Sequence, residues 1–173
     1  MNRHRHILIF LTAMLIAFGG SAGRAAAGDL SMEDAKVLAA YPLTEDKLQR
    51  KFAVAADLGR LSAADPALQR QLQSVNEGPG LDAQIKAFGA IPKAAAIMQS
   101  HGISARDYCL TTLAINYALM SQVPAQLRPA NLPPEPALVA APPGHVEFVQ
   151  SHMDEIHKLT AAIMQARKET QHQ

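Results

Sequence analysis

The sequence contains one cysteine, no tryptophan and few aromatic residues of any kind. Cys109 is the only thiol among 173 residues, and Phe, Tyr and Trp together make up 5% of the chain. A single cysteine cannot form a disulfide within the chain, which excludes the small disulfide-stabilised scaffolds. With so few aromatic rings, the hydrophobic core must be built mainly from Ala, Leu, Ile, Val and Met.

Sequence motifs that carry catalytic or nucleotide chemistry are also missing. G-x-S-x-G, H-E-x-x-H, a phosphate-binding loop and C-x-x-C-H do not occur in the chain. Lys and Arg form no dense cluster, so the electrostatic footprint of a nucleic-acid interface is absent. We therefore expect no nucleic-acid partner, and no motif indicates a reaction.

The first 27 residues have the pattern of a secretory signal peptide. Arg3 and Arg5 precede a nearly unbroken apolar run, Ile7 to Phe18, and Ala25-Ala26-Ala27 supplies an A-x-A cleavage pattern. A helix of about twelve residues spans about 18 Å, well short of the roughly 30 Å hydrocarbon core of a bilayer. We expect cleavage before Gly28 and a soluble mature protein, periplasmic or secreted, with no membrane span.

Removal of this segment would reverse the sign of the net charge. The complete chain has 16 Lys and Arg against 15 Asp and Glu, for a formal charge of +1. Arg3, Arg5 and Arg24 leave with the signal and no acid does, so 13 basic and 15 acidic residues remain. The mature chain is therefore expected to be slightly acidic, near −2.

Start and stop signals of helices recur through residues 28–123, which we interpret as a helical core. Ser31, Thr44, Asp65-Pro66 and Ser104 each stand where a helix N-cap is expected, and Gly102 suits a left-handed C-cap. The helix predicted from Ser104 to about Ser121 is apolar most of the way round, which is typical of a central, buried helix.

Residues 124–143 hold seven of the eleven prolines and predict an irregular strap rather than a helix. Residues 144–168 predict one long helix with a narrow apolar stripe that includes Met153 and Ile156. We expect this helix to pack on the core near Leu110, Leu113 and Tyr117, either within a monomer or in a helix-swapped dimer. Residues 169–173 are expected to form a disordered tail.

These segments predict an all-α fold. The expected architecture is a compact bundle of about five to six helices, with the proline-rich strap before a long C-terminal helix.

The C-terminal segment Ser151 to Lys158, SHMDEIHK, raises the possibility of a metal site. His152 and His157 are separated by about 140° around a straight helix, so they cannot share one ion. Met153 and His157, four residues apart, could offer a soft pair to copper with a further ligand such as His101. The alternative, which we favour, is the solvated face of a structural helix, with no cofactor.

Cys109 has two interpretations. Its position near the start of a helix could lower the thiol pKa and make it a nucleophile. Its apolar surroundings instead indicate a small buried side chain, because free cysteine behaves as a hydrophobe. No histidine stands at a diagnostic spacing, and we favour the buried interpretation.

Three stretches carry a resemblance to known proteins: Leu43 to Leu48, Pro92 to Tyr108 and His145 to Val149. Together they resemble small exported helical proteins of Gram-negative bacteria that are grouped as families of unknown function, and this resemblance implies no activity. A second resemblance is to the Spy and CpxP periplasmic chaperones, which carry an L-T-x-x-Q motif. Here Leu43-Thr44 is followed by Glu45-Asp46-Lys47, so lysine stands in place of the glutamine.

The sequence therefore favours a non-catalytic binding or interaction protein of the periplasm, with another protein or a small ligand as partner. One alternative is a metal-binding or stress-responsive protein that uses His101, Met153 and His157. Another is an enzyme that uses Cys109.

Overall fold

A computed structural model describes residues 31–75, 80–123 and 141–171, with side chains up to Gln165. The described residues form eight helices and no strand, which confirms the all-α class with more helices than expected. Within these ranges, no helix combines the length and the apolar content needed to cross a bilayer. The expected signal peptide, 1–27, and residues 124–140 of the strap lie outside the described residues.

In chain order the helices are α2 (Met32–Ala39), α3 (Glu45–Ala64), α4 (Pro66–Val75), α5 (Leu81–Gly89), α6 (Pro92–Ser100), α7 (Ala105–Ser121), α8 (Pro143–Ser151) and α9 (Met153–Gln171).

The capping signals mark the starts of several helices correctly. At α2, Ser31 Oγ accepts from the Asp34 amide, and the Asp34 carboxylate accepts from the Ser31 amide. At α7, Ser104 Oγ accepts from the Asp107 amide over 3.0 Å. The carboxylate of Asp65 caps α4 through two backbone amides. These contacts satisfy amides that have no partner within the helix itself.

Gly102 forms the joint between α6 and α7. Its φ of +62° lies in the left-handed region that favours glycine. A Cβ at this position would come within 2.6 Å of the Arg50 guanidinium, whose Nη1 donates to the Gly102 carbonyl over 2.8 Å. The joint is thereby tied to α3.

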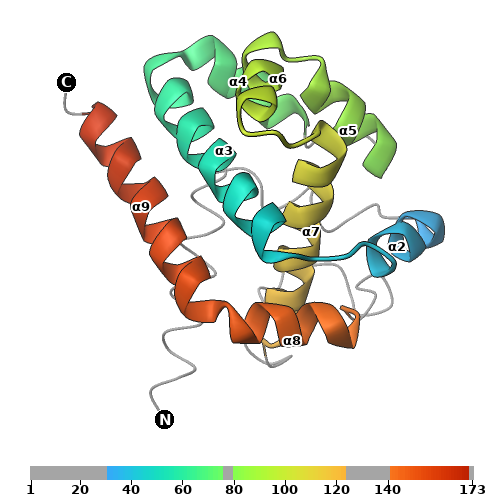
Figure 1. Ribbon diagram of the computed structural model, residues 1–173. Helices are drawn as coiled ribbons and strands as arrows, with labels where there is room; N and C mark the ends of the chain where they lie inside the picture. The colour runs from blue at the N-terminus through green and yellow to red at the C-terminus, as the bar shows by residue number, and fades with distance from the viewer. Residues whose placement is uncertain (1–30, 76–79, 124–140, 172–173) are drawn as a thin grey trace.

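Helices α3 and α7 contribute to both hydrophobic clusters of the fold (Figure 1). The first cluster combines α4, α5 and α6 with parts of α3 and α7, and it includes the stacked rings of Phe88 and Tyr108. Ile103, which directly precedes the N-cap residue of α7, is buried in the same cluster. The second cluster joins α2, α8, α9 and Leu81 at the start of α5 to the other parts of α3 and α7. The expected burial of α7 is therefore observed.

The single C-terminal helix expected over 144–168 is two helices that change direction at His152 (Figure 1). His152 leaves helical geometry, with φ −107° and ψ 15°. Its Nδ1 lies 2.8 Å from the Phe148 carbonyl oxygen, and its ring stacks on that of Phe148. The same carbonyl also accepts from the His152 amide and the Ser151 hydroxyl, and no glycine or proline marks the end of α8.

The two C-terminal helices pack on different parts of the core. α8 packs against α7, as expected, whereas α9 lies along α3. The buried side of α9 consists of Ile156, Thr160 and Ile163. α9 also continues to Gln171, so the segment 169–173, expected to be a disordered tail, is helical over its first residues.

Candidate functional site

The three residues considered as copper ligands lie in separate parts of the structure. His101 follows the last turn of α6, whereas Met153 and His157 lie in the first turns of α9. α6 and the start of α9 lie at opposite ends of the molecule (Figure 1). Among the described residues, no group of three or more His, Cys, Asp or Glu side chains is placed to hold a metal ion. The structure does not bring the candidate ligands together.

His101 is instead paired with Asp57 of α3, with 2.7 Å between Nε2 and Oδ2. Partial burial would raise the pKa of Asp57, but the hydrogen bond with His101 and the contact with Arg60 outweigh it and hold that pKa below its usual range. A histidine oriented by an aspartate needs a hydroxyl or thiol beside it to act in nucleophilic catalysis. In the described part of the chain, Asp57 is the only hydrogen-bond partner of the His101 ring. The pair ties α6 to α3.

Cys109 is partly buried and packs against the cluster around Phe88 and Tyr108. Burial raises the pKa of its thiol to about 12. The thiol is therefore protonated at neutral pH, and the reactive thiolate is not populated. Desolvation outweighs the helix-start position that motivated the nucleophile hypothesis.

A polar network around Tyr41 was not predicted from the sequence. Tyr41 Oη lies 3.0 Å from Asp107 Oδ1 and 2.9 Å from Thr111 Oγ1. The Lys47 ammonium lies 4.0 Å from the Tyr41 ring centroid and 3.8 Å from Asp107 Oδ1. Burial raises the pKa of Tyr41 above its ordinary range, so the phenol stays neutral. The network fastens the α2–α3 connection to α7.

His145 of α8 extends this network. Its Nε2 lies 2.7 Å from the backbone carbonyl oxygen of Tyr41, and the side chain is buried. The only local signal for these contacts is that Tyr41 precedes a proline, which ends α2. Because Tyr41 and Asp107 are 66 positions apart, no short pattern could reveal them as partners.

Lys51 is a second feature that sequence reasoning missed. It lies on α3 one turn from both Leu48 and Ala55, and its side chain is completely buried. Its ammonium nitrogen is 4.0 Å from the centroid of the Phe52 ring. Burial lowers the pKa of Lys51 to about 7. The periodicity around Leu48 and Ala55 is the one signal that could have indicated a buried lysine.

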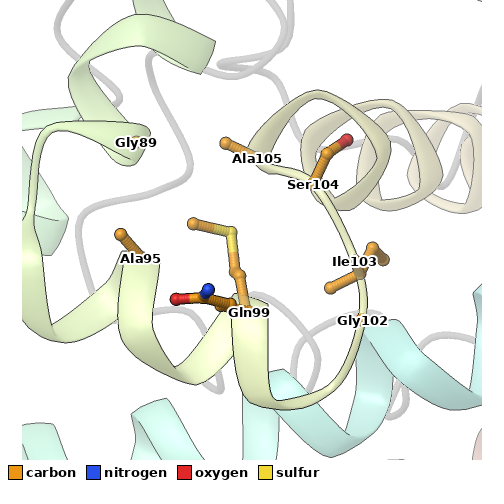
Figure 2. Close-up of a pocket in the computed structure, with 8 residues that line it drawn as sticks. Gly89, Ala95, Gln99, Gly102, Ile103, Ser104 and Ala105 are labelled. Carbon is orange, nitrogen blue, oxygen red and sulfur yellow. The ribbon is translucent and has the colours of Figure 1, made fainter.

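A pocket opens between the end of α5, α6 and the start of α7, which we call the α5–α6–α7 pocket (Figure 2). Its volume is about 440 Å³ and it is open to solvent. Met98 and Ile103 are buried residues of its lining, so much of the wall is apolar. The lining residues are Gly89, Ala95, Met98, Gln99, Gly102, Ile103, Ser104 and Ala105.

The pocket exists because small residues stand where the three helices meet. An added Cβ at Gly89 would lie 3.5 Å from the Cβ of Ala105, which shows how closely α5 approaches α7 there. Figure 2 shows Ala95, Gln99 and Ala105 around the same space. The Ser104 hydroxyl is engaged in capping α7. The Gln99 amide group makes no hydrogen bond within the described residues, and it is the polar group left to face a ligand.

Comparison of the chain with protein-family models, with curated proteins and with solved structures gave no match.

Proposed function

We propose that the protein is a non-catalytic binding protein of the periplasm. In this proposal, the α5–α6–α7 pocket holds a small aliphatic molecule that carries one hydrogen-bonding group. The observation that carries the proposal is the pocket itself, with its apolar lining and its single uncommitted amide, Gln99.

The size and lining of the pocket fit this class of ligand. Ligand pockets are commonly about 300–1,000 Å³ in volume, mostly apolar, with a few polar groups that orient the ligand. The volume of about 440 Å³ falls in this range, and the site is a shallow depression open to solvent rather than an enclosed cavity. Met98 adds an adaptable wall, because a methionine side chain has several rotatable bonds and accommodates different apolar shapes.

The chemistry of the described side chains supports binding rather than catalysis. The Cys109 thiol is held in its protonated form by burial, and the His101 ring is committed to Asp57. Export rests on the N-terminal pattern, with a basic start, a short apolar run and an A-x-A sequence.

The pocket can be tested with 1-hexanol as probe and amide NMR as readout. Ala95→Leu would place a larger side chain in the pocket and obstruct it, whereas Ala96→Leu places the same side chain on the exposed neighbouring position of α6. We expect the probe to shift the amide signals of Gly89, Gly102 and Ile103 in the wild-type protein and in Ala96→Leu, but not in Ala95→Leu. Shifts that are absent, that fall elsewhere, or that persist in Ala95→Leu would overturn the proposed site.

A further inference from the structure

The tautomer of His145 follows from its hydrogen bond. Its Nε2 lies 2.7 Å from the carbonyl oxygen of Tyr41. A carbonyl oxygen can only accept a hydrogen bond, so Nε2 must carry the hydrogen. In the neutral ring, Nδ1 is then the unprotonated nitrogen.

Nδ1 of His145 is buried and has no hydrogen-bond partner among the described residues. The residue as a whole is 6% exposed, so water does not readily replace the missing partner. Protonation of the ring would place an N–H and a positive charge at this nitrogen. A buried donor without an acceptor is strongly unfavourable, and a buried charge without a counter-charge more so.

The charged groups around His145 do not provide that acceptor. The carboxylate of the network, Asp107, already accepts from Tyr41 and Ser104, and it faces the Lys47 ammonium. None of the ionisable side chains on the surrounding elements makes a hydrogen bond or ion pair with His145 in the described structure. These side chains are Tyr41 and Lys47 beside the α2–α3 connection, Asp107 and Tyr117 on α7, Glu147 on α8, and Asp154, Glu155 and His157 on α9.

We propose that His145 is an acid-sensitive lock that holds α8 on the core when neutral and releases it when protonated. The neutral ring connects the first turn of α8 to the α2–α3 connection through the Tyr41 carbonyl. Charging the ring leaves Nδ1–H without an acceptor, and outward movement of α8 is the simplest way for that group to reach water. Val149, one turn further along α8 and fully buried, would become exposed in the same step.

Two other histidines respond differently and serve as internal references. His101 Nε2 already faces the carboxylate of Asp57, so a protonated ring would gain an ion pair there. His152 directs Nδ1 to the Phe148 carbonyl, and it is only partly buried. A positive charge would therefore find a counter-charge at His101 and none at His145. This difference makes His101→Gln a matched control for His145→Gln.

The test is amide hydrogen exchange of the full chain at about pH 7.5 and about pH 5, corrected for the intrinsic pH dependence of exchange. We expect protection of the Val149 amide in α8 to fall by about tenfold or more at the acidic pH in the wild-type protein and in His101→Gln. His145→Gln, which cannot gain the charge, should show no such fall. Unchanged α8 protection in the wild-type protein, or an equal loss in His145→Gln, would overturn the lock.

A second measurement keeps the proposal testable if His145→Gln does not fold. The imidazole NMR signals of the wild-type protein report the protonation of each histidine ring directly. The proposal requires that the amides of α8 lose protection over the same pH range in which the His145 ring becomes protonated. Loss that follows another histidine, or that occurs while the His145 ring is still neutral, would contradict it.

Discussion

Replacing Lys51 with methionine should remove a rise in stability that the wild-type protein shows between neutral and mildly alkaline pH. Lys51 is completely buried in α3, and burial lowers its pKa from 10.5 to about 7. In the unfolded chain the lysine keeps its ordinary pKa, so between these values the unfolded state binds more protons than the folded state. The free energy of unfolding must then increase with pH across this window. Below about pH 7, the full destabilising effect of the buried lysine charge is present.

The size of the effect follows from the same two pKa values. At 1.36 kcal/mol per pH unit, the full difference corresponds to about 5 kcal/mol. Only part of this free-energy difference can be measured separately, because Tyr117 and Cys109 begin to ionise in the unfolded chain at higher pH. Between about pH 7 and about pH 9 the contribution of Lys51 should amount to about 2 kcal/mol.

Urea unfolding at both pH values measures this contribution. The comparison uses the wild-type protein, Lys51→Met and the exposed control Lys158→Met. Methionine has a similar volume and no charge, so Lys51→Met should fold and be at least as stable as the wild type at neutral pH. From pH 7 to 9, the wild type should gain about 2 kcal/mol relative to Lys51→Met, and Lys158→Met should follow the wild type. A constant difference between wild type and Lys51→Met would refute the argument from burial.

Three further predictions concern other residues of the fold. Cys109 should react slowly with a thiol reagent in the native protein and quickly in urea, because burial raises its pKa to about 12; equal rates would show an accessible thiol. Ile156→Ala should lower the free energy of unfolding by roughly 2–5 kcal/mol, since the side chain is fully buried between α9 and the core, whereas the exposed Lys158→Ala should change it little. Asp57→Asn should lower the free energy of unfolding above pH 3.8, because the depressed pKa of Asp57 stabilises the folded protein there. The difference from the wild-type protein should shrink as the pH falls through the folded-state pKa of Asp57. Thermal melts at neutral and acidic pH would contradict this if the loss were the same at both.

Features set by neighbouring residues could be predicted from the sequence, and those set by distant contacts could not. The capping residues Ser31, Thr44 and Ser104 are found at the predicted helix starts, because a cap depends on backbone groups only three positions away. Gly102 adopts the left-handed conformation expected of it. The end of α8 escaped prediction because no glycine or proline stands at His152 to mark it.

The candidate sites show the same difference between features set by neighbouring residues and features set by distant contacts. The expected divergence of His152 and His157 assumed one straight helix, whereas the chain changes direction at His152, between α8 and α9. The partner of His101 is Asp57, which lies 44 positions earlier, and Tyr41 meets Asp107 across 66 positions. Only the packing of α3 against α6 and α7 brings such residues together. Likewise, the α5–α6–α7 pocket depends on how three short helices meet, which their separate periodicities do not encode.

Native mass spectrometry of the protein isolated from its native host tests the proposed binding function most directly. We predict that the wild-type protein and Ala96→Leu carry the added mass of a small organic molecule, and that Ala95→Leu, whose larger side chain obstructs the pocket, carries none. The proposal is contradicted if the wild-type protein carries no added mass or only a metal ion. It is equally contradicted if the same organic mass remains on Ala95→Leu.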